Sequence, residues 1–262
     1  MNMEYKTIQV ATEGVAALIL LNRPEKRNAI TFEMMDEIEA ALRTLGADPA
    51  VRGIIIAGTG DCFSTGMDLN ALKGVISTAQ FLDYMQRWQA LNMAMENHAK
   101  PIIAAIEGYC ITGGFELALA CDLRVGAEGS QYGITSSKIG TVPGAGGTQR
   151  LPRIVGTANA LDILFSSEFI DAQRAREIGL LSRLTPKGEA LAMAKAMVEV
   201  YATRAPLSLR FMKQAVYGGM QMPLTDAIRF EAFVVSTVYQ TEDKQEGINA
   251  FLEKRPASFK GR

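Results

Sequence analysis

Residues 102–116 read IIAAIEGYCITGGFE and place three kinds of local structure in immediate succession. The run from Ile102 to Ile106 is short and apolar throughout, a pattern typical of a strand buried on both faces. Glu107 to Gly114 then form a glycine-rich turn, and a helix is predicted from about Gly114 to Cys121. Extended structure resumes over Asp122 to Val125. Strand, turn, helix and strand in this order indicate stacked βα units and therefore an α/β fold.

The segments that precede this stretch fit the same fold class. Residues 5–21 contain two apolar segments divided by Glu13-Gly14, which predicts a short hairpin. Residues 53–58 form another apolar run bounded by glycines and predict a second strand buried on both faces. Two amphipathic helices are expected, one from Thr31 to a stop at Gly46 and one over about residues 79–98, because apolar side chains recur on one stripe of each.

The chain becomes mainly helical after about residue 143. The predicted helices span roughly residues 188–203, 223–239 and 243–253, and a further one that follows Pro206 and stops at Gly218-Gly219. These segments are rich in apolar side chains. We therefore expect the C-terminal layer to pack on the core, on another subunit, or on both.

Composition narrows the chemistry that this chain can perform. The 262 residues include one histidine, three cysteines, 27 Lys and Arg, and 28 Asp and Glu, which gives a formal charge of −1. A zinc site needs several nitrogen or sulfur ligands at a recognisable spacing, which one histidine and three scattered cysteines do not supply. Near-neutral charge without a basic stripe argues against nucleic acid and anionic membranes as partners. The expected ligand is a small molecule.

The cellular compartment is predicted from the cysteines and from the apolar segments. An odd number of scattered cysteines is typical of reduced thiols rather than of a disulfide framework. The N-terminus lacks an apolar leader, and no stretch approaches the ~18 apolar residues of a membrane span. These features favour a cytoplasmic protein without membrane insertion.

Two glycine-containing turns, residues 63–69 and 108–116, follow the predicted buried strands. Ligands of open α/β folds bind at the carboxyl ends of strands, where a glycine turn lets backbone N–H groups approach them. Two such turns on neighbouring strands would direct two N–H donors at one oxygen and form an oxyanion hole, which polarises a thioester carbonyl and holds an enolate. Ordinary strand-to-helix turns explain the same glycines, and both interpretations stay open.

Glu116 lies on the first helical turn after the second of these segments. The helix dipole alone stabilises a carboxylate there by about 0.3–1 kcal/mol, and this stabilisation explains the glutamate without any function. The alternative is a general base held above the oxyanion site, because the helix directly follows the glycine turn.

Other patterns are weaker candidates for chemistry. Residues 144–147 read GAGG, but the third glycine of a dinucleotide-binding GxGxxG motif would fall on Gln149. His98 lies at a predicted helix end, where a capping or partly buried histidine is the ordinary explanation. A serine hydrolase would need a GxSxG elbow, which the sequence lacks. Cys110 is explained as a small buried residue.

Several motifs recur in one order over nearly the whole chain. They are LNRPEKRNA (residues 21–29), FSTGMDL (63–69), GYCITGGFELALACD (108–122), GTVPGAGGTQRL (140–151) and a C-terminal segment over residues 246–256. This combination strongly resembles the crotonase family, also called the enoyl-CoA hydratase/isomerase family.

The resemblance implies a crotonase-like spiral of ββα units with a C-terminal α-helical trimerisation region. It further implies a homotrimer or dimer of trimers that acts on acyl-CoA thioesters, with coenzyme A as part of the substrate and no permanently bound cofactor. Residues 1–190 are accordingly expected to form the core with the active site. Residues 191–262 are expected to mediate oligomerisation and to complete the CoA site.

Carried over by position, the resemblance assigns the two oxyanion donors to the backbone N–H groups of Met67 and Gly113, and the first catalytic glutamate to Glu116. The second glutamate of the family's hydratases falls on Ser136, which cannot act as a carboxylic acid at neutral pH. The positions matched to CoA binding are Lys26, Arg27, Thr65, Met67, Asp68, Leu69, Phe251 and Lys254, the last two reaching the CoA site of a neighbouring subunit.

An oxyanion hole and one carboxylate suffice for reactions that pass through a thioester enolate. Because Glu116 matches the residue that helps activate water, an enoyl-CoA hydratase-type lyase is expected first. The alternatives are a Δ3,Δ2-enoyl-CoA isomerase and an acyl-CoA decarboxylase or hydrolase of the same fold. Because Ser136 replaces the second acid, a non-catalytic acyl-CoA-binding subunit is a further alternative.

Overall fold

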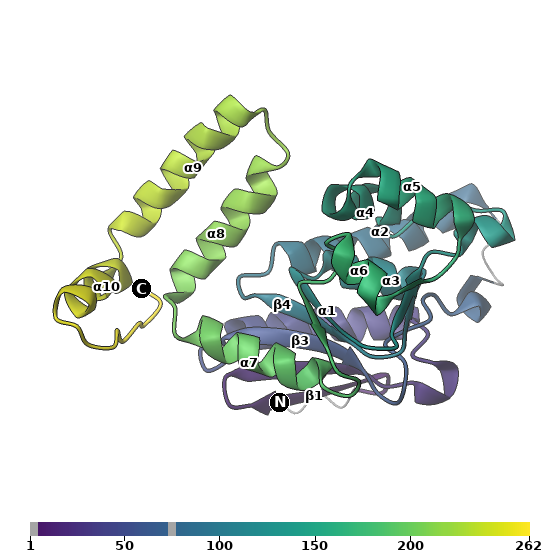
Figure 1. Cartoon of the computed structure of the whole chain (residues 1–262), viewed down its shortest axis with the longest axis horizontal. Coiled ribbons are helices and arrows are strands. Elements are labelled where there is room, and N and C mark those ends of the chain that lie inside the picture. Colours follow the sequence, from purple (N-terminus) through teal and green to yellow (C-terminus); the bar gives the residue numbers. More distant parts are fainter. Residues whose placement is uncertain (1–4, 73–76) are drawn as a thin grey trace.

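A six-stranded sheet forms the centre of the computed structural model, which describes residues 5–72 and 77–262 (Figure 1). In spatial order its strands are β1 (Ile8–Glu13), β2 (Ala16–Leu21), β3 (Gly53–Gly58), β4 (Ile102–Ile106), β6 (Leu123–Ala127) and β9 (Arg183–Thr185). Strands β1 and β2 pair antiparallel and form the predicted hairpin, whereas the other neighbouring strands are parallel. Ile55 on β3 aligns with Ile103 on β4, so the carboxyl ends of these two strands meet at one edge.

A second sheet contains three short strands, β5 (Tyr109–Ile111), β7 (Gln131–Gly133) and β8 (Ile170–Asp171). Strands β4 and β6 of the large sheet are each followed by a strand of the small sheet and then by a helical segment, which makes two ββα units. The turn predicted over residues 107–114 therefore contains a strand, β5. Three residues are too few to show an alternating pattern in the sequence.

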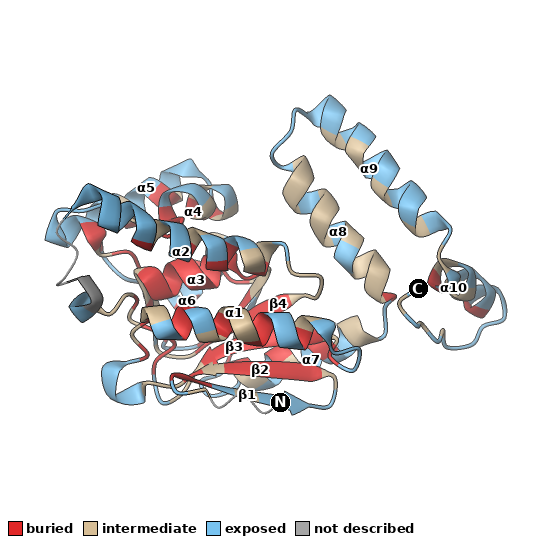
Figure 2. Ribbon diagram, turned by 180° about the vertical axis from the view of Figure 1, so that it is seen from behind, coloured by how far each residue is buried: buried red, intermediate tan, exposed pale blue. Residues whose placement is uncertain are grey.

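The large sheet is buried on both faces, as its apolar runs predict. Helices α1 (Phe32–Ala47), α2 (Thr78–Glu96) and α3 (Gly113–Ala120) share one hydrophobic cluster with Ile54 and Ile56. Helix α7 (Ala190–Ala202) packs on the opposite face against Ile55 (Figure 2). All residues of α3 are buried, so this short helix lies within the core rather than on its surface.

The first amphipathic helix begins where the sequence predicts and ends slightly later. Thr31 is its N-cap and accepts a hydrogen bond from Met34 N–H at 3.2 Å. Helix α1 continues past Gly46 to Ala47, and the glycine leaves space for the His98 ring, since an added Cβ at Gly46 would lie 2.8 Å from His98 Nε2. His98 hydrogen-bonds the backbone of Leu42 and Lys100, so its role is the structural one that its position favours.

Short helices connect the small sheet to α7. They are α4 (Gly147–Val155), α5 (Thr157–Ser166) and α6 (Ala172–Glu177), and the 3₁₀ segments of the chain are η1 (Pro24–Lys26), η2 (Leu69–Leu72) and η3 (Ser136–Ile139). Across the described ranges, no helix combines the length and the apolar character that crossing a membrane requires.

Three C-terminal helices extend away from the sheets (Figure 1). They are α8 (Pro206–Gly219), α9 (Leu224–Tyr239) and α10 (Glu242–Leu252), which confirms the predicted helices and the end of α8 at its glycine pair. Neither α8 nor α9 contains a buried residue. Polar contacts join α8 to the core, where Lys213 Nζ donates to Asp122 Oδ2 and to Met95 O, both at 2.9 Å, and Tyr217 donates to Asp122 Oδ1 at 3.0 Å. The division of the chain at residue 190 stays a prediction, and α7, which begins there, packs on the sheet.

Candidate active site

The two glycine turns that follow β3 and β4 lie against each other. Ser64 and Cys110 form a parallel bridge, in which Ser64 N–H donates to Tyr109 O and Ile111 N–H donates to Ser64 O, both at 3.0 Å. The turns approach so closely that a Cβ added to Gly66 would lie 2.7 Å from Gly113 N. A Cβ added to Gly113 would lie 3.1 Å from Met67 N. The structure thus brings together the two N–H groups that the sequence predicts as a pair.

Unusual backbone conformations orient both N–H groups. Gly66 has φ of +94°, and Thr112, the residue before Gly113, has φ of +49°. A positive φ is costly for threonine and is retained here by hydrogen bonds from Thr112 N–H to Gly133 O at 2.8 Å and between Thr112 and Thr135 side chains at 3.0 Å. Within residues 5–72 and 77–262, neither Met67 N–H nor Gly113 N–H donates to a protein acceptor. Two free donors therefore point away from the protein's own hydrogen-bond network.

Glu116 lies one helical turn beyond Gly113 and is 3% exposed. Its Oε1 accepts a hydrogen bond from Gly147 N–H at 2.8 Å. Burial raises the pKa of the Glu116 carboxyl to about 7, against the lowering effects of the Gly147 and Ala145 N–H groups and of the Arg150 charge. A carboxyl with this pKa exchanges a proton readily near neutral pH, which is the property of a general base or acid.

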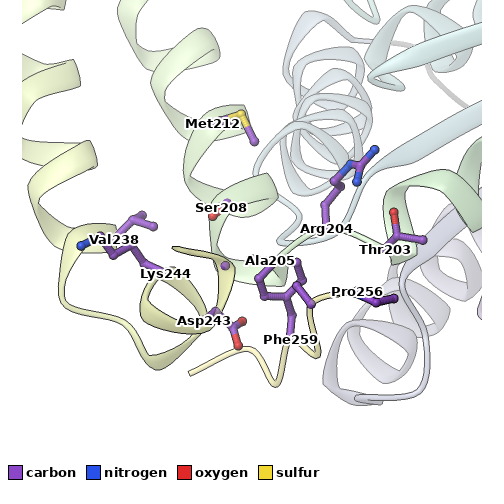
Figure 3. Close-up of a pocket in the computed structure, with 12 residues that line it drawn as sticks. Thr203, Arg204, Ala205, Ser208, Met212, Val238, Asp243, Lys244, Pro256 and Phe259 are labelled. Atoms are coloured by element: carbon purple, nitrogen blue, oxygen red, sulfur yellow. The ribbon is translucent and has the colours of Figure 1, made fainter. Parts of the chain in front are cut away.

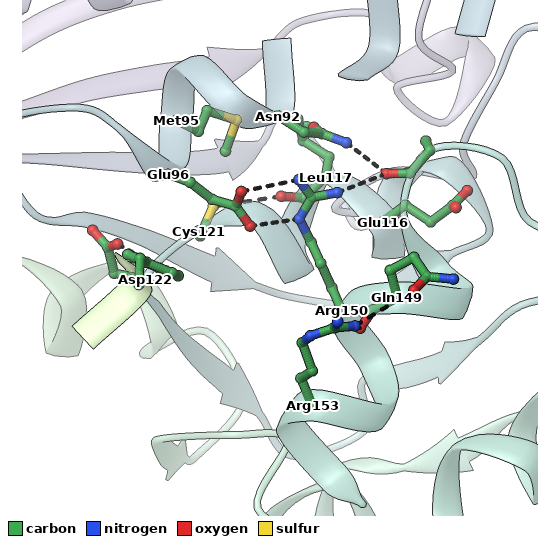
Figure 4. Close-up of polar contacts among 12 residues, drawn as sticks. Asn92, Met95, Glu96, Glu116, Leu117, Cys121, Asp122, Gln149, Arg150 and Arg153 are labelled. Carbon is green, nitrogen blue, oxygen red and sulfur yellow. Dashed lines mark hydrogen bonds and ion pairs between the residues drawn. The ribbon is translucent and has the colours of Figure 1, made fainter. Parts of the chain in front are cut away.

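A buried polar network holds the turn that contacts Glu116 (Figure 4). Arg150 on α4 pairs with Glu96 on α2 through two hydrogen bonds, of 2.6 and 3.1 Å. Arg150 Nη1 and Asn92 Nδ2 both donate to Ala145 O, at 3.2 and 2.7 Å. The network holds residues 145–147 in place. It therefore also positions the Gly147 N–H group, which donates to Glu116. The network joins two distant segments of the sequence, and only Ala145 and Arg150 lie within a quoted motif.

Ser136, which the resemblance matches to the second glutamate, is buried at the start of η3. It lines a cavity of about 320 Å³ together with Ile134 and Pro143. Those two side chains also border Gly147, where an added Cβ would lie 2.8 Å from Ile134 Cδ1 and 2.9 Å from Pro143 Cβ. The cavity is thus adjacent to the Glu116 turn. Among the described residues, no carboxylate joins Ser136 in its lining.

The residues matched to CoA binding in the first loops fall into two groups. Lys26 and Arg27 are exposed, and Leu69 is 62% exposed, so all three are accessible to a ligand. Asp68 instead pairs with Arg23 at 3.0 Å, a contact that holds the first glycine turn, residues 63–69, against the loop that contains Arg23. Thr65 donates through its N–H to Arg27 O at 3.1 Å. The structure therefore gives Asp68 and Thr65 roles within the protein.

The two C-terminal positions matched to CoA binding lie far from the glycine turns of the same chain. Phe251 ends α10 with 83% of its surface exposed, and Lys254 follows on the exposed segment after it. Helix α10 lies at the open end of the α8 and α9 hairpin, opposite the turn that joins these two helices (Figure 1). A single chain therefore does not bring these residues to Glu116.

The larger of the two cavities is also away from the glycine turns. It has a volume of about 690 Å³ and lies between the start of α8, helix α10 and the segment after it (Figure 3). Asp243 lines it and accepts hydrogen bonds from Lys260 N–H at 2.6 Å and Gly261 N–H at 2.7 Å. The described lining residues include neither Met67, Gly113 nor Glu116.

Fold and site together define an α/β protein that presents two free N–H donors beside a buried carboxyl. The chain belongs to the enoyl-CoA hydratase/isomerase family, whose model matches residues 11–262. It is 36% identical over 261 residues to a probable enoyl-CoA hydratase of Rhizobium meliloti, covering 99% of this chain and 100% of the relative. It is 35% identical over 258 residues to the crotonyl-CoA hydratase of Syntrophomonas wolfei, covering 98% of this chain and 99% of that relative.

A solved structure confirms the fold. The enoyl-CoA hydratase of Bacillus anthracis superposes with a TM-score of 0.93 at 32% identity, covering 98% of this chain and 100% of that one. The protein therefore has the crotonase fold with a helical C-terminal region that its motifs predict.

Proposed function

We propose that this enzyme adds water to the double bond of an enoyl-CoA thioester, with Glu116 as the base and then the acid. The observation that carries the proposal is the juxtaposition of a buried carboxyl, whose pKa is about 7, with the free N–H groups of Met67 and Gly113. Relatives named enoyl-CoA hydratase and crotonyl-CoA hydratase support the same substrate class.

The proposed reaction uses these groups in two steps. The Glu116 carboxylate removes a proton from water while the water oxygen bonds to C3, and the π electrons move to the thioester oxygen. The N–H groups of Met67 and Gly113 stabilise the negative charge on that oxygen. Protonated Glu116 then returns a proton to C2, and the carbonyl re-forms. Ser136 takes no part in proton transfer, so one carboxyl performs both.

An acyl-CoA panel at several pH values tests the proposal. We expect hydration of crotonyl-CoA, with kcat/KM rising about tenfold per pH unit below pH 7 and reaching a plateau above it, because Glu116 must be deprotonated to act as a base. Loss of the conjugated enoyl absorbance measures the rate.

The same panel separates the alternatives. Conversion of 3-enoyl-CoA to 2-enoyl-CoA without hydration would indicate an isomerase. Release of free CoA or carbon dioxide would indicate a hydrolase or decarboxylase. Binding of acyl-CoA without hydration or α-proton exchange in D2O would contradict an enzymatic role altogether.

The CoA site is proposed to be completed in a homotrimer or dimer of trimers. Helices α8, α9 and α10 carry many exposed apolar side chains, which supports contact with another copy of the chain. Their exposed apolar residues include Met212, Val216, Leu224, Ile228, Phe233, Val235, Phe251 and Leu252. Such contact would allow Phe251 and Lys254 of one chain to reach the CoA of another, and it would leave CoA as part of the substrate rather than as a resident cofactor.

Replacing Lys254 by alanine tests this part of the proposal. We expect KM for acyl-CoA to rise about tenfold and to become less sensitive to salt, with little change in kcat, because a phosphate contact is lost while the reacting groups are intact. Lys187→Ala, which removes another exposed lysine, is the matched control. Equal KM values for the two variants at low salt would contradict the assigned role of Lys254.

A further inference from the structure

Helix α2 buries three polar atoms that have no hydrogen-bond partner among the described residues, namely Tyr84 Oη, Trp88 Nε1 and Asn92 Oδ1. Tyr84 is 2% exposed and Trp88 is 0% exposed, yet neither Tyr84 Oη nor Trp88 Nε1 has a hydrogen-bond partner among the described residues. Buried polar groups in native proteins are nearly always hydrogen-bonded. Asn92 Oδ1 is an acceptor, whereas the Tyr84 hydroxyl is a donor whose proton no described residue accepts.

Packing places these side chains beside the glycine turns. A Cβ added to Gly113 would lie 3.4 Å from Trp88 Cη2, so the indole lies against the residue that supplies one free N–H group. The Tyr84 ring packs edge-on against Phe32 with centroids 4.8 Å apart. Phe32 follows Ile30, which pairs with Met67, the residue that supplies the other free N–H group. Tyr84 and Trp88 are one helical turn apart and therefore share this face of α2.

The pKa of the Tyr84 hydroxyl is consistent with a position beside the two glycine turns. The pKa of the Tyr84 phenol is raised to about 12, mainly by burial and also by the nearby carboxylates Glu116 and Asp68, while the neighbouring Trp88 indole N–H acts in the opposite direction. The hydroxyl is consequently neutral at pH 7 and able to donate. Asp68 adjoins Met67 and Glu116 follows Gly113, so the two carboxylates that act on Tyr84 belong to the two turns of the candidate site.

We propose that the Tyr84 hydroxyl is a catalytic residue that donates a hydrogen bond to the oxygen atom joined to, or removed from, C3 of the acyl chain. This inference rests on the proposed hydration. As Glu116 removes a proton from water, negative charge develops on the attacking oxygen, and a neutral hydroxyl donor stabilises that charge. Tyr84 keeps its own proton throughout. In the reverse direction the same bond assists departure of the C3 hydroxyl, which Glu116 protonates.

Tyr84→Phe tests the proposal because it keeps the ring that packs on Phe32 and removes only the hydroxyl. We expect kcat for hydration of crotonyl-CoA to fall at least about tenfold, with KM within about twofold of the wild type. Exchange of the α-protons of butyryl-CoA in D2O should stay within about twofold of the wild-type rate. That reaction forms the same enolate but involves no oxygen at C3.

Tyr132→Phe is the matched control, since Tyr132 is equally buried and its hydroxyl is bonded to Ser130 at 2.9 Å. It should leave hydration and exchange unchanged and lower Tm, because it breaks a satisfied hydrogen bond, whereas Tyr84→Phe should not lower Tm. Tyr84→Phe hydrating at the wild-type rate, or losing hydration and exchange in equal proportion, would overturn the inference. A wild-type enzyme that exchanges α-protons but hydrates no enoyl-CoA would instead refute the proposed function.

Discussion

Glu116→Gln is expected to lower kcat for enoyl-CoA hydration by about 10³-fold, with little change in KM. Glutamine keeps the shape of the side chain and an oxygen that can accept the Gly147 N–H, but it cannot take a proton from water. Exchange of α-protons in D2O should be lost as well, because the same carboxyl moves both protons. Stopped-flow or steady-state hydration and NMR-detected exchange measure the two effects.

Stability distinguishes this loss of chemistry from a folding defect. The folded-state pKa of Glu116, about 7, lies above its ordinary value of 4.5, so the folded state holds a proton that the unfolded state releases between these pH values. Stability of the wild type therefore falls as pH rises through this window, by up to about 3 kcal/mol. Glu116→Gln avoids this cost and should be more stable than the wild type at pH 8, as measured by urea denaturation.

Glu128→Gln provides the control for the Glu116 variant, because Glu128 is exposed at a loop away from the glycine turns. Its activity and its stability should match those of the wild type at both pH 5 and pH 8. Equal hydration rates for wild-type protein and Glu116→Gln would refute the role of Glu116 as the base.

Gly66→Ala should remove both hydration and α-proton exchange, with a loss of about 10²- to 10³-fold in kcat. The new Cβ would lie 2.7 Å from Gly113 N and 3.1 Å from Ile111 O, which are backbone atoms that cannot move aside without separating the two turns. The N–H groups of Met67 and Gly113 would then no longer converge on one oxygen. Parallel measurement of hydration and exchange checks that both fail, since both require the enolate.

Gly129→Ala separates this steric effect from backbone strain. Gly129 also has a positive φ, +84°, but an added Cβ there meets no atom within 4 Å. In both variants the free energy of unfolding should fall by about 1–2 kcal/mol, because alanine is strained in the left-handed conformation, yet only Gly66→Ala should lose activity. If folded Gly66→Ala retained the activity of Gly129→Ala, the two turns would not form the oxyanion site.

The sequence predicts the large sheet and its helices well, because their apolar patterns are long enough to read. The stripe that includes Met35, Ile38 and Leu42 is buried on α1, and α2 and α8 begin within one residue of their expected starts. Strand β5 was not predicted, since pairing with β7 stabilises it and its own three residues show no period. The close approach of Gly46 to the His98 ring likewise joins residues that are remote in the sequence.

The residues of the candidate site also fall into two groups, those that the sequence indicates and those that only the structure shows. The two glycine turns and Glu116 are visible in the sequence, and the family resemblance assigned the N–H groups of Met67 and Gly113; the structure places these residues together. Tyr84 and Trp88 read as ordinary core residues of an amphipathic helix, because a hydroxyl or an indole N–H without a partner has no signature in a sequence. The ion pair of Arg150 with Glu96 also joins segments that no local pattern connects.

The sequence by itself indicated the family, the longer strands and helices and, through the resemblance, the expectation that Ser136 stands where the hydratases have a second glutamate, because these depend on residue identity and on spacing within one segment. Only the tertiary structure decided how Glu116 titrates and where the unpartnered donors lie. Desolvation and hydrogen bonding depend on what surrounds a group in space. For Glu116 those surroundings include Gly147, 31 residues further along the chain, held in place by a third segment.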